Sequence, residues 1–142
     1  RMESGFIHWG HDISPEENQY QAGLKFAISF KKNVDFIGKK ALMNIKDKEL
    51  DKRLMMFTLQ ENKPGEPLLL HDEPIYLDDK IIGRTTSGNY SFCYEKNLSF
   101  GYVNSGNSYE TLKDKNVFIE VEKKKYPVYI LQMPLNQKDY KN

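Results

Sequence analysis

Short runs of strand-forming residues, each separated from the next by turn-forming residues, fill the chain from Leu54 onward. The runs are residues 54–59, 68–71, 74–77, 80–86, 98–103, 117–122 and 126–131. Asp78-Asp79 and Lys123-Lys124-Lys125 stand where hairpins would turn the chain back. Short, closely spaced strands of this kind are typical of a small antiparallel barrel. We therefore predict a mostly β fold of the α+β class that ends in an antiparallel β-barrel.

The segment before this β region has a mixed pattern. Gly5 follows a short run that is typical of the last turns of a helix, since helices commonly end at glycine. Large apolar residues at every second position of residues 24–30, Phe26 among them, predict a strand. Residues 38–46 have apolar side chains at helical spacing after a glycine, which predicts a short helix.

The most polar run of the chain, residues 47–53, separates these two regions. Such runs usually form solvated linkers, although a charged docking stretch is the alternative interpretation. We therefore predict two domains, residues 1–48 and residues 49–142.

Composition narrows the classes of function. The 142 residues include 21 basic and 20 acidic side chains, for a net charge of +1, which is not the clustered basic footprint of a nucleic-acid-binding domain. No apolar run approaches the ~20 residues of a membrane helix, so we expect no membrane partner. The single cysteine, Cys93, excludes an intrachain disulfide, and we interpret it as a half-buried, inert thiol.

Few residues suggest chemistry on their own. His8 and His11 are three apart but lack a third ligand at suitable spacing, so we interpret them as structural and expect no metal site. Residues 83–88 could present backbone N–H groups to an anion, but a strand with a bulge and a glycine turn is the favoured interpretation. Trp9 and Phe26 are core residues by default, and the competing hypothesis is that one ring stacks on a planar heterocycle. We identify no catalytic residues in the chain.

Several segments, in their order along the chain, resemble the C-terminal part of the glycine-cleavage T-protein family, and above all its dimethylglycine and sarcosine dehydrogenase branch. These segments are Arg1-Met2-Glu3-Ser4-Gly5-Phe6, Trp9-Gly10-His11-Asp12-Ile13, Ala22-Gly23-Leu24, residues 35–42, Thr86-Ser87-Gly88, Phe100-Gly101-Tyr102-Val103, Tyr126-Pro127 and Pro134-Leu135. Each motif is moderately specific, but together they cover nearly the whole chain. The resemblance implies that residues 1–48 end a folate-binding aminomethyltransferase-type domain and that residues 49–142 form the family's C-terminal barrel.

The resemblance also implies a cofactor and two cofactor-binding residues. Phe26 occupies the position where relatives place Trp or Tyr against the ring system of tetrahydrofolate. Tyr140 stands where some transferase relatives carry a tyrosine that contacts the ligand. FAD is expected only in a more N-terminal part of a parent protein, as are the catalytic residues. The expected partners are therefore folate and the remaining N-terminal domains of the parent chain, and we expect residues 1–142 alone to be inactive.

Alternatives remain open at this point. One is a stand-alone glycine-cleavage aminomethyltransferase, and another is a non-catalytic folate-binding or interaction barrel. A folate-dependent iron–sulfur assembly relative is disfavoured, because Asp35 stands where that group has a cysteine. The sequence also departs from the family pattern at Gln19, Gln21 and Phe92-Cys93-Tyr94. The usual location of members of the resembled family predicts a cytoplasmic location in a bacterium and the mitochondrial matrix in a eukaryote.

Overall fold

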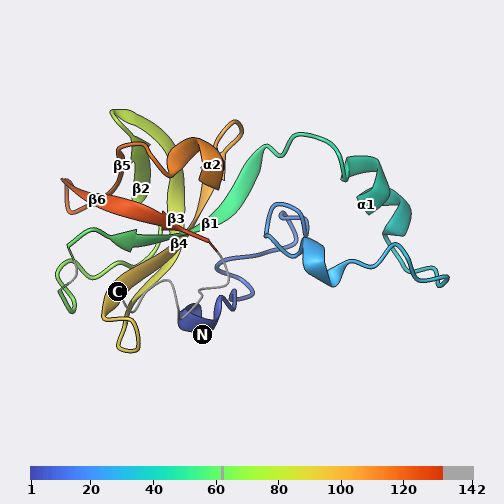
Figure 1. Ribbon diagram of the computed structural model, residues 1–142, viewed down its shortest axis with the longest axis horizontal. Helices are drawn as coiled ribbons and strands as arrows, with labels where there is room; N and C mark the ends of the chain where they lie inside the picture. The colour runs from blue at the N-terminus through green and yellow to red at the C-terminus, as the bar shows by residue number, and fades with distance from the viewer. Residues whose placement is uncertain (62, 133–142) are drawn as a thin grey trace.

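Six antiparallel strands form a closed barrel in the computed structural model, which describes residues 1–61 and 63–132 (Figure 1). The strands are β1 (Lys52–Leu59), β2 (Pro74–Leu77), β3 (Lys80–Ser91), β4 (Lys96–Asn104), β5 (Val117–Val121) and β6 (Lys124–Leu131). Around the barrel they follow the order β1-β4-β3-β2-β5-β6, and β6 pairs with β1 to close it. Closure leaves no unpaired sheet edge. The predicted mostly β fold with an antiparallel barrel is confirmed.

Four short helical segments accompany the barrel within the described residues. Two are 3₁₀ turns, η1 (Met2–Ser4) and η2 (Lys25–Ala27), and two are α-helices, α1 (Lys39–Ile45) and α2 (Tyr109–Leu112). Gly5 and Gly38 flank η1 and α1 in the left-handed conformation that glycine adopts without strain, as their sequence positions suggest. No helix in the described part of the chain is long and apolar enough to cross a membrane.

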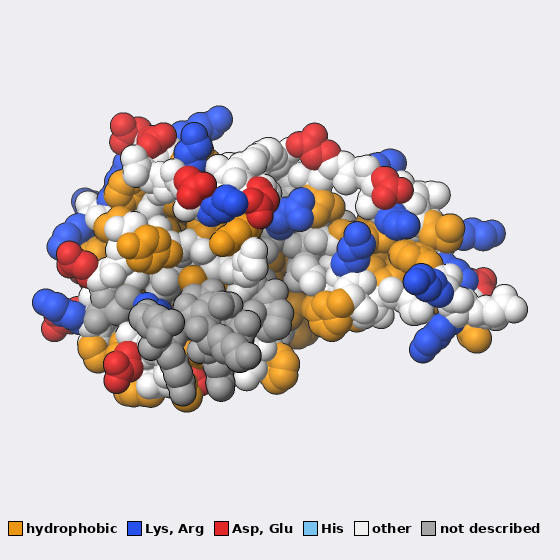
Figure 2. Space-filling model, viewed as in Figure 1, with side chains coloured by type: hydrophobic (Ala, Val, Ile, Leu, Met, Phe, Trp, Pro, Cys, Tyr) orange, Lys and Arg blue, Asp and Glu red, His pale blue; other side chains and the backbone are white. Residues whose placement is uncertain are grey.

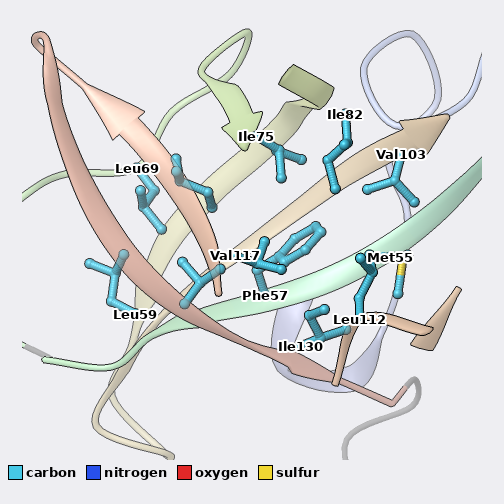
Figure 3. Close-up of a cluster of buried hydrophobic side chains, with 12 residues drawn as sticks. Met55, Phe57, Leu59, Leu69, Ile75, Ile82, Val103, Leu112, Val117 and Ile130 are labelled. Atoms are coloured by element: carbon cyan, nitrogen blue, oxygen red, sulfur yellow. The ribbon is translucent and has the colours of Figure 1, made fainter. Parts of the chain in front are cut away.

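The interior of the barrel is filled by side chains from every strand (Figure 3). Met55, Phe57 and Leu59 alternate along β1 and point inward, where Phe57 is completely buried. The other members of this core are Leu69, Ile75, Ile82, Val103, Leu112, Val117, Ile119, Val128 and Ile130. Gly101 on β4 is required here, because a Cβ atom at this position would lie 2.8 Å from the backbone carbonyl oxygen of Arg84 on the paired strand.

A second apolar cluster lies on the outside of the barrel, against β1 and β4. Leu54 and Met56 of β1 point outward and pack with Leu98, Phe100 and Leu131. The N-terminal segment covers them through Met2 and Ile7. Because β1 is buried on both faces, its sequence is a continuous apolar run rather than an alternating one.

Two predicted strands are wrong. Residues 24–30 contain the 3₁₀ turn η2 instead of a strand, and residues 68–71 form no strand although Leu69 reaches the core. An alternating pattern becomes a strand only where a neighbour supplies the hydrogen bonds of the ladder. No described strand pairs with either segment, and the backbone N–H of Leu70 instead donates to the Glu73 carboxylate at 2.9 Å.

Residues 24–48 extend away from the barrel and carry α1 at their far end (Figure 1). We refer to this segment as the appendage. Residues 1–23, by contrast, lie along the barrel wall and connect it to the appendage. The domain boundary at residues 47–53 stays a prediction; β1 begins inside that run, at Lys52.

Candidate functional site

A buried carboxylate, Asp12, attaches the N-terminal segment to the barrel. Its Oδ2 accepts hydrogen bonds from Nη1 of Arg1 at 2.9 Å and from the backbone N–H of His8 at 2.8 Å. Its Oδ1 accepts from the hydroxyls of Thr86 and Ser87 on β3, at 2.6 and 2.7 Å. Because this side chain is fully buried and ionised groups need such partners away from water, the four donors fix the segment against β3.

We refer to the contact between the N-terminal segment and the barrel around Asp12 as the junction. Tyr102 on β4 adds to it. Its hydroxyl donates to the carbonyl oxygen of Asp12 at 2.9 Å, and Nζ of Lys52 lies 5.1 Å from the centroid of its ring. Burial, together with the negative charges of Glu17 and Asp12, raises the pKa of Tyr102 well above its ordinary value. The phenol is therefore a neutral hydrogen-bond donor at every physiological pH.

Two glutamates complete the attachment. Oε1 of Glu17 accepts from Nζ of Lys52 at 2.5 Å; burial opposes ionisation of Glu17, but hydrogen bonds from Lys52 and Ser14 outweigh it and lower its pKa. Oε1 of Glu3 accepts from the Ser91 hydroxyl at 2.5 Å and from the backbone N–H of Cys93 at 3.2 Å, and these bonds lower the pKa of Glu3. Both carboxylates thus hold the N-terminal segment to the barrel in their ionised form.

The appendage encloses a hollow of about 520 Å³. Its lining is mainly apolar, with a few polar side chains, which is the usual character of a small-molecule site. The apolar residues are Ala27, Ile28, Val34, Phe36, Ile37 and Leu42, and the polar ones are Gln19, Ser29, Lys32 and Asp35. The hydroxyl of Tyr20 donates to the carbonyl oxygen of Leu42 at 3.2 Å and so ties the far wall of the hollow back to the N-terminal segment.

Phe26 lies in η2, directly before Ala27 of this lining, and 86% of its surface is exposed. The default interpretation of Phe26 and Trp9 as core residues is wrong, since Trp9 is also 66% exposed. Phe26 does not itself line the hollow, but its exposed ring has a free face for stacking. Its role as a folate-binding residue stays a prediction, and Tyr140, the other predicted binding residue, lies outside the described residues.

The remaining sequence-based interpretations have mixed outcomes. The segment 83–88 lies within β3 and contains a register shift between Thr85 and Ser87, so the predicted strand with a bulge is confirmed. The predicted glycine turn is wrong, because Gly88 lies inside β3 and pairs with Ser99. Cys93 is exposed rather than half-buried. The rings of His8 and His11 stack on each other with centroids 4.8 Å apart. No group of three or more metal-ligating side chains occurs within residues 1–61 and 63–132.

Sequence reasoning missed the junction entirely. In the sequence Asp12 is only one member of a motif, because its hydroxyl partners Thr86 and Ser87 are 74 and 75 positions away. The signal that could have found it is an acidic residue shortly after the apolar run Phe6-Ile7, together with adjacent hydroxyl residues in a strand. That signal is weak without knowledge of the strand register.

Comparison with known proteins assigns the fold to a family. Residues 52–136 match the glycine cleavage T-protein C-terminal barrel domain. The chain belongs to this family. A crystal structure of the glycine cleavage system aminomethyltransferase T from Bartonella henselae superposes with a TM-score of 0.77 at 23% identity, covering 94% of this chain and 36% of that one. The shared fold therefore extends beyond the barrel to residues of the N-terminal segment and appendage.

Two relatives show the same extent of similarity in sequence. Human mitochondrial dimethylglycine dehydrogenase is 37% identical over 137 residues, which are 95% of this chain and 15% of that protein. The aminomethyltransferase of Listeria innocua is 34% identical over 134 residues, which are 94% of this chain and 35% of that protein. The chain thus corresponds to a minor part of each of these relatives.

Proposed function

We propose that this chain forms the C-terminal wall of a tetrahydrofolate site in a flavin-dependent N-methyl-amine dehydrogenase of the dimethylglycine or sarcosine type. The observation that carries the proposal is the exposed ring of Phe26, which directly precedes Ala27 in the lining of the apolar hollow of the appendage. The similarity to dimethylglycine dehydrogenase over 95% of the chain supports the choice of enzyme class.

The residues present fit a pterin coenzyme. Its ring system is planar and apolar on its faces but carries hydrogen-bonding groups along its edge. Phe26 offers a flat face, while Gln19, Ser29 and Asp35 offer polar groups in the lining of the hollow. Phenylalanine lacks the polar handle of the Trp or Tyr that the family resemblance implies at this position, so its contribution is confined to stacking.

Tetrahydrofolate, when bound, supplies the nitrogen nucleophile that takes up a one-carbon unit. The residues of this chain bind and orient the coenzyme and exclude water around it. Asp12 holds the connecting segment on the barrel, and the Tyr20 hydroxyl ties α1 back to that segment. The chain offers no dinucleotide fingerprint, so in this proposal FAD binds in another part of the protein, together with the catalytic residues.

Titration of the full-length protein with tetrahydrofolate tests the proposal. We expect Phe26→Ala to weaken the affinity about tenfold, because stacking of a heterocycle on an aromatic side chain contributes ~1–3 kcal/mol. Phe92→Ala is a matched control, since Phe92 is another aromatic residue, 82% exposed, but on the barrel. Equal effects of the two substitutions would remove Phe26 from the site. A full-length protein that does not bind tetrahydrofolate would contradict the folate assignment itself.

A second candidate is a stand-alone aminomethyltransferase, which the 34% identity to the Listeria innocua enzyme over 94% of the chain favours. The two candidates share the folate site and differ in the flavin. The visible absorbance of bound flavin in the purified full-length protein, and its bleaching by an N-methyl amine, distinguish them. A folate-binding protein without flavin would support the aminomethyltransferase, and a protein that binds neither would support an interaction barrel.

A further inference from the structure

The appendage concentrates positive charge to a degree that the rest of the chain does not. Residues 24–48 contain seven lysines against two aspartates, a net charge of +5, whereas the whole chain carries only +1. Residues 52–132 of the barrel contain eleven residues of each sign. Figure 2 shows the basic side chains projecting from the end of the molecule that carries α1. The charge asymmetry lies between two regions of one small protein.

These lysines have no acidic partners in the described part of the chain. Lys25, Lys31, Lys32, Lys40 and Lys48 are exposed, and no ion pair within residues 1–61 and 63–132 includes them. Lys113 and Lys125 of the barrel each pair with a carboxylate, at 2.6 and 3.0 Å. Other barrel lysines, such as Lys80, form no described ion pair, but the equal number of acidic residues in the barrel balances their charge. The field of the appendage is therefore uncompensated and extends into solvent for about one Debye length, ~8–10 Å at physiological ionic strength.

Two further lysines and an exposed methionine occupy one side of α1. Lys39, Met43 and Lys46 follow the spacing i, i+4, i+7, which places them along one face of a helix. The ammonium groups of Lys39 and Lys46 lie 6.0 Å from the ring centroids of Phe36 and Phe30, which holds their stems on the appendage. Met43 is 55% exposed between them. Met43 therefore offers a partner an apolar contact between two positive charges.

From these observations we infer that the lysine-rich surface of the appendage is a docking surface for an acidic segment of a partner protein. Charge complementarity selects the partner. A second copy of this chain offers a neutral barrel, an equally basic appendage and an N-terminal segment, residues 1–23, with a net charge of −3. Three of the four carboxylates of that segment, those of Glu3, Asp12 and Glu17, are already held by partners within the chain, so a second copy does not neutralise the surface. The absence of arginine from residues 24–48 selects carboxylates over phosphates. Lysine acts as a point charge, whereas phosphate recognition favours the bidentate guanidinium group.

Dispersed lysines of this kind act mainly on the rate of association. Electrostatic steering raises association rates by about ten- to a thousandfold and weakens steeply with added salt. The expected complex is therefore a transient one, in which the acidic partner arrives and leaves quickly. This inference is independent of folate, because Lys31, Lys40 and Lys48 do not line the hollow of the appendage.

Binding of poly-L-glutamate to the full-length protein, followed by titration calorimetry at increasing NaCl concentration, tests the inference. We expect the triple variant Lys31→Glu/Lys40→Glu/Lys48→Glu to bind at least about tenfold more weakly at low salt than the wild type. Lys80→Glu/Lys115→Glu/Lys123→Glu is the matched control, since it makes the same change in net charge with exposed barrel lysines that form no described ion pair. It should lose less than about twofold.

Two kinds of result would contradict the inference. Equal losses in the two triple variants would show that only net charge matters. Tighter binding of poly(U) RNA, or of vesicles containing phosphatidylserine, than of poly-L-glutamate at the same salt would assign the surface to another class of partner. Circular dichroism confirms that both variants fold, and unchanged tetrahydrofolate affinity of the first variant separates this outcome from that of the proposed folate site.

Discussion

The barrel buries its large apolar side chains, whereas the appendage exposes several of its own. Phe57 and Phe100 of the barrel are completely buried, one inside the barrel and one beneath the N-terminal segment. In the appendage, Phe26 is 86% exposed and Ile37 fully so. A closed sheet satisfies its own hydrogen bonds and buries its own core, whereas a seven-residue helix is too short to be stable alone. The barrel thus has a buried core of its own, whereas residues 24–48 contain no fully buried side chain.

The junction around Asp12 connects these two regions. Its interactions are polar and buried, and they cross between the N-terminal segment and β3. The appendage follows this segment along the chain. If Asp12 moved away from β3, Phe26 would therefore also move relative to the barrel. We infer from this difference that the barrel stabilises the protein and that the appendage provides the binding surface.

The largest expected effect belongs to the barrel core. Phe57→Ala removes a fully buried ring and should lower the free energy of unfolding by about 3–5 kcal/mol, because the cavity that it leaves cannot collapse within a closed sheet. Urea denaturation followed by far-UV circular dichroism measures this. A loss below about 1 kcal/mol would contradict the packed interior in Figure 3.

The next largest effect belongs to the junction. Asp12→Ala leaves the hydroxyls of Thr86 and Ser87 and the guanidinium of Arg1 without their acceptor, which should cost about 2–3 kcal/mol. We expect amide hydrogen exchange to rise in residues 1–23 while β1 and the other strands keep their protection. Exchange that rises equally in the barrel would show that the segment and the barrel unfold as one unit.

The sequence predicted the barrel well because its signals are local. The continuous apolar run of β1 and the turn residues Asp78 and Asp79 specify strands and hairpins within a few residues. Burial on both faces explains why that run does not alternate. The closing pair β1–β6 joins residues more than sixty positions apart, but it follows once the strands are recognised as a barrel.

The sequence predicted the candidate site only in part, because exposure and distant contacts leave weak local signals. Residues 24–30 alternate like a strand, yet without a pairing neighbour they form a turn that leaves Phe26 outside any core. Family resemblance, not periodicity, pointed to that ring. The role of Asp12 depends on the register of β3, which local patterns do not encode.

Lowering the pH should loosen the junction before it affects the barrel. Hydrogen bonds hold the pKa values of Glu3 and Glu17 below the ordinary value of 4.5. Their contribution to stability is therefore complete above about pH 4.5 and is lost as the pH falls through the lowered pKa values. Urea midpoints measured between pH 7 and 3 should fall less steeply for Glu17→Gln than for the wild type. Identical slopes would show that Glu17 does not couple protonation to folding.

The smallest expected effect on stability belongs to Phe26, although its side chain is the most exposed aromatic one in the appendage. Because its ring is almost entirely in solvent, Phe26→Ala should change the free energy of unfolding by less than about 0.5 kcal/mol, in contrast to the same substitution at Phe57. Urea denaturation of residues 1–142 measures both variants under the same conditions. A loss above about 1 kcal/mol for Phe26→Ala would mean that the ring packs against the protein in solution. The ring would then have no free face for a coenzyme, and the contrast between the barrel and the appendage would fail at the residue on which the proposed function depends.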